Sequence, residues 1–169
     1  MRKLAIISVI SIAICVWISP LSYAQMAKEG SGNYASAKSG SMTLLPMEKE
    51  RLQMNFEEKG IVTDVPQNCP LYNASFIDLG TTHAIKGKFT GTGFMEFTIP
   101  SGDKVYGTID IVEGVLGQGS SGIVKFVGGT GSCQGITGSI EYKPGPSVKS
   151  GKQDIYFGKT IGKISWKIP

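Results

Sequence analysis

Apolar and polar residues alternate along most of the chain after residue 42, and this pattern predicts β-strands rather than helices. Between Glu50 and Glu58, the side chains of Leu52, Met54 and Phe56 fall on one face, and polar side chains fall on the other. The same alternation recurs in later segments, namely 94–99, 104–112, 136–142 and 161–168. No amphipathic run of helical period extends beyond about two turns. The pattern therefore predicts an all-β chain of about eight short strands.

Glycine and proline divide these runs into strands and turns. The chain has 23 glycines, most of them after Gly60, and Pro100-Ser101-Gly102-Asp103 is typical of a hairpin turn. We expect one strand to end at residues 91–93, a loose connection at 114–122 and a loop at 143–152. Short strands separated by tight turns predict an antiparallel sandwich or a closed barrel, formed by one domain over residues 42–169.

The first 24 residues have the three parts of a secretory signal peptide. Arg2 and Lys3 precede an uncharged apolar run, residues 4–18, and Ser22-Tyr23-Ala24 forms a cleavage site before Gln25. An uncleaved membrane anchor is disfavoured, because the run is shorter than the roughly 20 residues that span a bilayer. We therefore expect a signal peptide at 1–24, a periplasmic or secreted protein, and no stable membrane insertion after cleavage. Residues 25–41 are small and polar, which predicts a flexible N-terminal arm.

The charge pattern argues against nucleic-acid binding, and the cysteine content leaves one disulfide possible. The formal net charge is +4, two of the basic residues lie in the leader, and the remaining lysines and glutamates are interspersed, so we expect no nucleic-acid partner. Only Cys69 and Cys133 follow the leader. An oxidising compartment allows a disulfide between them, provided that their Cα atoms lie within about 7 Å. The alternative is a pair of free thiols, held apart by a proline-rich loop and a glycine-rich turn.

The second half of the chain resembles a group of bacterial exported proteins that share the barrel of allene oxide cyclase and dirigent proteins. The resemblance covers about half of the chain after the leader and depends on four segments, GFMEFT at 93–98, SGDKVYGT at 101–108, VKFVGGTG at 124–131 and GITGS at 135–139. It implies a small closed antiparallel β-barrel, similar in outline to lipocalins. It implies no activity and no set of catalytic residues.

Two polar residues are candidates for chemistry. His83 is the only histidine, so a multi-histidine metal site is excluded, and we predict no metal and no cofactor. Asp78 lies near enough in sequence for a Ser-His-Asp arrangement, but no strained nucleophile turn accompanies it. Glu96 interrupts an otherwise apolar strand: it is solvated if it faces outward, and it could orient a ligand or act as a base if it faces the lumen.

The apolar faces define the candidate interior. An eight-stranded barrel is just wide enough to be filled by side chains or to hold one small ligand. The side chains expected to line such a space are Met54, Phe56, Met95, Phe97 and Trp166.

These features predict an exported, non-enzymatic β-barrel that binds a small apolar ligand or a partner surface. The alternative is an enzyme of the cyclase or dirigent type, in which the barrel holds a reactive apolar intermediate. A small outer-membrane barrel is disfavoured because several strands carry lysines, Lys86, Lys88, Lys125, Lys163 and Lys167 among them. The identity of the ligand and the oligomeric state are left open at this point.

Overall fold

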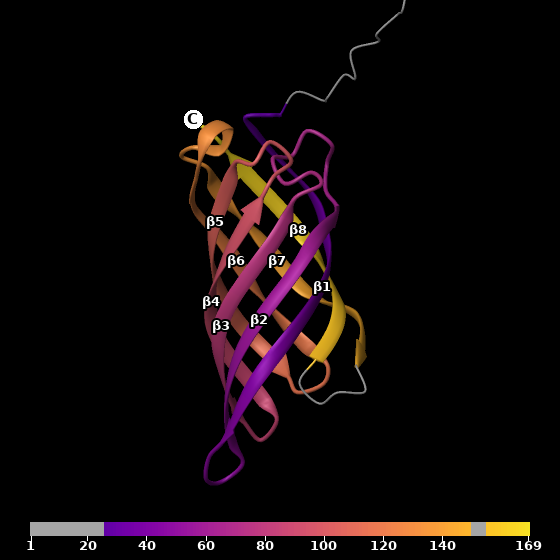
Figure 1. The fold of residues 1–169 in the computed structure, drawn as a ribbon, viewed down its shortest axis with the longest axis vertical. Coiled ribbons are helices and arrows are strands. Elements are labelled where there is room, and N and C mark those ends of the chain that lie inside the picture. Colours follow the sequence, from indigo (N-terminus) through magenta and orange to yellow (C-terminus); the bar gives the residue numbers. More distant parts are fainter. Residues whose placement is uncertain (1–25, 150–154) are drawn as a thin grey trace, which may run out of the picture.

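The protein is a closed barrel of eight antiparallel strands, in which each strand pairs with the next and β8 pairs with β1 (Figure 1). The computed structural model describes residues 26–149 and 155–169; the expected signal peptide lies outside them. The strands are β1 Glu29–Pro46, β2 Arg51–Asp64, β3 Ser75–Ile85, β4 Lys88–Thr98, β5 Lys104–Val115, β6 Gly119–Gly129, β7 Thr137–Lys149 and β8 Ile155–Lys167, with a short helix η1 at Gly131–Cys133. The described residues include no helix with the length and apolarity that crossing a membrane requires. The predicted all-β closed barrel is confirmed.

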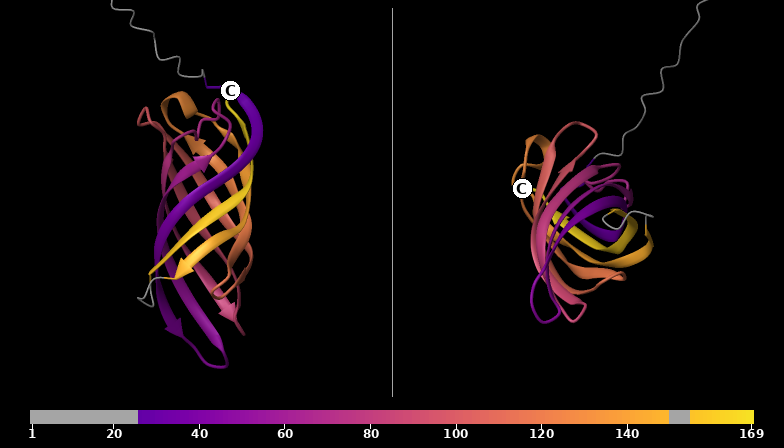
Figure 2. Two further views of the ribbon diagram at one scale, coloured as in Figure 1. Left: turned by 90° about the vertical axis from the view of Figure 1, so that its right-hand side faces the viewer. Right: turned by 60° about the horizontal axis from the view of Figure 1, so that its bottom comes forward.

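The strands are strongly tilted about the barrel axis. A row of hydrogen-bonded neighbours that starts at Met42 on β1 passes once around the barrel and returns to β1 at Gly32, ten residues away. Such a stagger requires tilted strands, and the tilt is visible in Figure 2. Because of this tilt, residues far apart along β1 contribute side chains to the same level of the interior.

The first strand corrects the prediction of a flexible N-terminal arm at 25–41. Residues 29–41 belong to β1, which pairs with β2 on one side and β8 on the other. Tyr34 and Ser36 face the interior and are buried. The small polar side chains gave this segment the composition of a linker, but its backbone finds hydrogen-bond partners along both edges, and this pairing stabilises an extended strand that composition does not favour.

Three expected breaks are also wrong, because the strands are longer than the alternation suggested. Residues 91–93 lie inside β4, and the turn before that strand is at Lys86-Gly87. The segment 114–122 belongs mostly to β5 and β6, and residues 143–149 continue β7. Gly91, Gly93, Gly114 and Gly122 are strand positions and not breaks, whereas Gly117 lies in the short turn between β5 and β6.

Many of these strand glycines lie directly opposite an aromatic residue on the neighbouring strand. In six such pairs the aromatic ring lies where the glycine's side chain would be, so that even a Cβ would overlap or crowd it. The pairs are Gly30 with Trp166, Gly40 with Tyr156, Gly60 with Phe76, Gly80 with Phe56, Gly114 with Phe89 and Gly122 with Tyr142. The glycines therefore provide the space in which large rings lie flat against the wall of a narrow barrel.

One end of the barrel is filled by a hydrophobic core. Phe97 is fully buried, with its ring centroid 5.8 Å from that of Phe76 and 6.4 Å from that of Phe126. Leu71, from the loop between β2 and β3, packs into the same cluster. Trp166 is buried there too, and its indole nitrogen donates a hydrogen bond to the carbonyl of Ala27 over 3.0 Å. The predicted burial of Trp166 is confirmed.

The two cysteines lie in this packed end as free thiols, so the structure does not contain the disulfide that the sequence allowed. Both are buried in the core cluster. Burial raises the pKa of the Cys69 thiol to about 12 and also raises the pKa of Cys133. A hydrogen bond from the backbone of Leu71 partly offsets the shift at Cys69, and one from Ser132 does so at Cys133. Each sulfur is thus accommodated as a small buried apolar group with a partner of its own.

The contact between Gly30 and Trp166 gives a direct test of the ring-over-glycine packing. Gly30→Ala should displace the indole, since the three atoms nearest to the added Cβ are all ring atoms of Trp166. We expect a loss of about 1–3 kcal/mol in the free energy of unfolding. In a chain that begins at Gln25, Trp166 is the only tryptophan, so its emission should also move to the red. Ser31→Ala, at the exposed neighbouring position, should change neither quantity. An unchanged emission in Gly30→Ala would contradict this packing.

Candidate functional site

The other end of the barrel is hollow. A cavity of about 500 Å³ extends from the core residues Phe76 and Ile140 to the turn Leu116–Gln118 between β5 and β6. This volume lies within the range of roughly 300–1,000 Å³ that is typical of small-molecule sites. The barrel interior is therefore packed at the end that carries η1 and hollow toward the β5–β6 turn.

The cavity has a polar wall and an apolar wall. The polar wall comes from β8, β1, β2 and β3 and consists of Ser36, Lys38, Glu58, Asp78, Thr82, Tyr156 and Thr160. The apolar wall comes from β4, β5 and β6 and consists of Met95, Ile109, Ile111, Val115 and Val124. Met54 and Phe56 add apolar surface on β2. A few grouped polar side chains in a mostly apolar space are the usual make-up of a small-molecule site.

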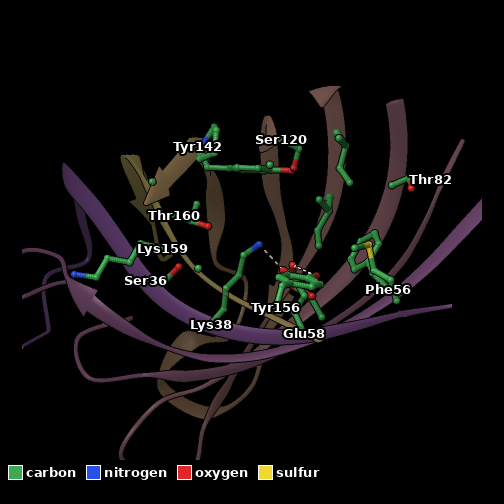
Figure 3. A pocket seen from close by; sticks show the side chains of 18 of the residues that line it. Ser36, Lys38, Phe56, Glu58, Thr82, Ser120, Tyr142, Tyr156, Lys159 and Thr160 are labelled. Atoms are coloured by element: carbon green, nitrogen blue, oxygen red, sulfur yellow. Dashed lines mark hydrogen bonds and ion pairs between the residues drawn. The ribbon is translucent and has the colours of Figure 1, made fainter. Parts of the chain in front are cut away.

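Glu58 is the centre of the polar wall. The ammonium group of Lys38 donates to its Oε2 over 2.5 Å, and the hydroxyl of Tyr156 donates to its Oε1 (Figure 3). Gly40 is opposite both Glu58 and Tyr156, and a Cβ at Gly40 would lie 2.7 Å from the Tyr156 hydroxyl. The missing side chain lets the phenol extend across β1 to the carboxylate. A buried carboxylate needs such partners, because burial removes its hydration.

Asp78 is the second acid of the polar wall. It is directly opposite Glu58 on β3 and is only 2% exposed. Burial, followed by the charge of Glu58, raises the pKa of Asp78 to about 8, although Lys38 acts in the opposite direction. At neutral pH the Asp78 carboxyl is therefore mostly protonated. Among the described residues, its Oδ1 has no hydrogen-bond partner.

Three tyrosines complete the polar surroundings, Tyr34, Tyr142 and Tyr156. Burial is the largest cause that raises the pKa of each phenol, and the charges of Glu58 and Asp78 add to it. The phenols thus stay protonated over the whole physiological range. They act as neutral hydrogen-bonding groups beside the two acids.

The structure separates the five apolar residues that the sequence grouped together. Met54, Phe56 and Met95 line the cavity. Phe97 and Trp166 do not, because both lie in the packed core at the opposite end. All five side chains are on the inward faces of their strands, as the alternation indicated. Which level of the barrel each residue occupies depends on the stagger of the strands and on the loops that fill one end.

The two polar candidates from the sequence lie outside the cavity. Glu96 is on the outer face, where its carboxylate accepts a hydrogen bond from Lys104 over 2.6 Å, with both side chains more than a third exposed. His83 is on β3 in phase with the outward residues, next to Gln53 and Thr90 in the register. Neither can contact a molecule in the lumen through its present orientation.

Sequence reasoning missed the residues that make up the polar wall. A signal for two of them was present. Glu58 continues the inward phase of Met54 and Phe56, and Asp78 is in phase with the buried Phe76. An acid in phase with an apolar face indicates a polar group that is directed inward. Lys38 had no comparable signal, because the composition of its segment predicts a flexible arm. Tyr156 lies in a segment that the sequence predicts as a short strand, but the alternation there does not indicate which side chains face inward.

The described residues include no cluster of three or more His, Cys, Asp or Glu side chains placed to hold a metal ion. The chain matches no protein-family model, no curated protein and no solved structure. The resemblance to the allene oxide cyclase and dirigent barrel stays a prediction, and the cavity itself is the basis for a functional proposal.

The buried Asp78 should make the stability of the barrel depend on pH. Its folded pKa of about 8 lies far above the unfolded value of roughly 4. Between these values the unfolded chain binds fewer protons than the folded chain, so the free energy of unfolding should fall as pH rises from about 4 to 8, and the loss should level off above pH 8. Asp78→Asn removes this titration.

Urea unfolding at pH 5, 7 and 9 checks this prediction. The stability of the Asp78→Asn variant should increase relative to the parent protein between pH 5 and 9. Glu96→Gln, which changes an exposed acid on the neighbouring strand, should follow the parent curve. If the free energies of unfolding of Asp78→Asn and of the parent protein changed in parallel with pH, the pKa of Asp78 would not be raised in the folded state.

Proposed function

We propose that this protein is an exported binding protein that holds a small, largely apolar ligand inside the barrel. The observation that carries the proposal is the cavity of about 500 Å³, which is hollow beside a fully packed core in the same barrel. A barrel that served only as a rigid scaffold would gain stability by filling this space, because unfilled apolar volume is destabilising. The proposal includes export because the leader has the composition of a secretory signal.

The two walls assign different roles in binding. Apolar contacts with β4, β5 and β6 supply affinity: burying roughly 200 Å² of apolar ligand surface contributes about 5 kcal/mol. That amount alone corresponds to weak binding, of the order of 0.1–1 mM. Additional affinity and the orientation of the ligand come from the polar wall around Glu58 and Asp78. The ligand is therefore an amphiphile with a polar group near one side of the cavity.

Binding in the lumen can be tested with N-phenyl-1-naphthylamine, an uncharged apolar dye whose emission rises in apolar surroundings. We expect saturable binding to the folded protein and a higher melting temperature in the presence of the dye. Val124→Trp should weaken binding at least tenfold, because Val124 lines the cavity. Val127→Trp makes the same change at an exposed position of the same strand and should leave binding intact.

The two outcomes that contradict the proposal are distinct. If the dye does not bind saturably to the folded protein, the lumen does not bind ligands of this class. If both tryptophan variants bind equally well while remaining folded by circular dichroism, the dye binds outside the cavity.

Export is tested separately in the native host. The mature protein should begin at Gln25, and its mass should lack residues 1–24. Mass spectrometry of the protein from the culture medium or the cell envelope gives this result directly. A mature protein that retains Met1 would contradict the export part of the proposal and leave the binding part untouched.

A further inference from the structure

Carboxyl groups outnumber paired cations in the lumen by one. Glu58 and Asp78 both line the cavity, and Lys38 forms its ion pair with Glu58. Lys159 also borders the cavity, but its side chain extends away from Glu58 (Figure 3) and the residue is exposed. Asp78 thus has no cation of its own among the described residues that line this space. It is tolerated in the apolar interior because it holds a proton.

The polar atoms that lack partners in this wall are oxygens. Among the described residues, Oδ1 of Asp78 and Oγ1 of Thr82 are buried and have no hydrogen-bond partner. Both residues lie on the inward face of β3 and line the cavity. Asp78 is 98% buried, so solvent outside the barrel does not reach it freely. A buried acceptor without a donor destabilises the fold, and a ligand that brings a donor would remove this penalty.

We propose that the lumen selects an amphiphilic amine, whose protonated nitrogen donates to Asp78 and Glu58 while its apolar skeleton lies against the β4–β6 wall. This inference rests on the proposed ligand-binding function and names the chemical class of the ligand. On binding, the O–H bond of the Asp78 carboxyl breaks, its proton passes to water, and the carboxylate forms an ion pair with the ammonium group. Two carboxylates then face two cations, Lys38 and the ligand.

The same charge count disfavours anionic ligands. A fatty carboxylate or a phosphate would need a cation, and Lys38 is already paired with Glu58 at 2.5 Å. The protonated Asp78 could donate one hydrogen bond to an anion, but it supplies no positive charge to balance it. A neutral alcohol could donate to Oδ1 but would release no proton. Three ligands that share one apolar chain and differ in their head group therefore separate these possibilities.

Binding of the amine should depend on pH through Asp78. The charged and titratable groups that face Asp78 are Glu58 from β2, Lys38 and Tyr34 from β1, Tyr142 from β7 and Tyr156 from β8. From β4 the opposite residue is Met95, which does not titrate. The three phenols have raised pKa values and stay protonated, and the pKa of Asp78 is about 8. The affinity for an amine should therefore rise about tenfold per pH unit from pH 6 to 8 and flatten above, because one proton leaves on binding.

Isothermal titration calorimetry with decylamine, decanol and decanoate tests the proposal on the chain that begins at Gln25. At pH 7, decylamine should bind at least tenfold more tightly than decanol, and decanoate should bind most weakly. Titrations in two buffers of different ionisation enthalpy should show release of about one proton with decylamine and none with decanol. Asp78→Asn should bring the affinity for decylamine to within about threefold of that for decanol and abolish proton release, since no titrating surplus acid remains. Glu96→Gln, the same chemical change on the outer face, should behave like the parent protein.

The results distinguish this proposal from the function on which it rests. If decanol and the uncharged dye bind but decylamine binds no more tightly and releases no proton, the amine proposal is overturned and the binding function stands. Tighter binding of decanoate than of decylamine would also overturn it. If neither the dye nor any of the three ligands binds, both proposals fail. Should Asp78→Asn not fold, the pH profile of decylamine binding to the parent protein decides the matter.

Discussion

The placement of aromatic rings over glycines determines the shape of this barrel. An eight-stranded barrel has little room inside, and large inward side chains on neighbouring strands would compete for it. In this chain, six aromatic residues are each opposite a glycine, and the rings lie in the space that the glycines leave. Trp166 over Gly30 and Phe76 over Gly60 belong to the packed end, whereas Tyr156 over Gly40 and Phe56 over Gly80 border the cavity. The packing of rings over glycines therefore fills one half of the lumen and forms part of the wall of the open half.

The electrostatics of the cavity follow from this packing. Tyr156 reaches Glu58 only because Gly40 has no side chain between them, and Lys38 completes the neutralisation of the carboxylate. The second acid, Asp78, is buried and has no cation of its own among the described lining residues, so it keeps its proton. A polar wall with one unbalanced acid is thus a consequence of where the glycines, the phenol and the core lie. The preference of this wall for a ligand that donates a hydrogen bond, and against an anionic ligand, comes from the same arrangement.

The apolar wall has a different origin. Met95, Ile109 and Val124 continue the inward phase of the core into the open half, whereas Leu71 from the loop between β2 and β3 packs into the core at the other end. The loop between β2 and β3 and the helix η1 both close the same end. The opposite end has a tight turn between β5 and β6, which lines the cavity without filling it. Among the described residues, loops thus fill one end of the barrel, and the turn at the other end leaves space that is available to a ligand.

The sequence by itself determined the fold class and the direction of many side chains. Period-two alternation identified the inward faces that carry Met54, Met95 and Trp166, since burying one face of a strand imposes that period whatever the partner strand is. The pattern of many short strands without helices left a sandwich and a closed barrel open, and it was the resemblance to the allene oxide cyclase and dirigent barrel that implied the closed form. The alternation could not reveal β1, whose small polar residues are held by backbone pairing on both edges. Only the tertiary structure decided which inward residues share a level, because strand register places Glu58 against Asp78 and the stagger separates Trp166 from Met54. The candidate site depends on strand register and stagger. Both bring together residues that are far apart in the chain, so neither can be recognised from the local pattern of apolar and polar residues.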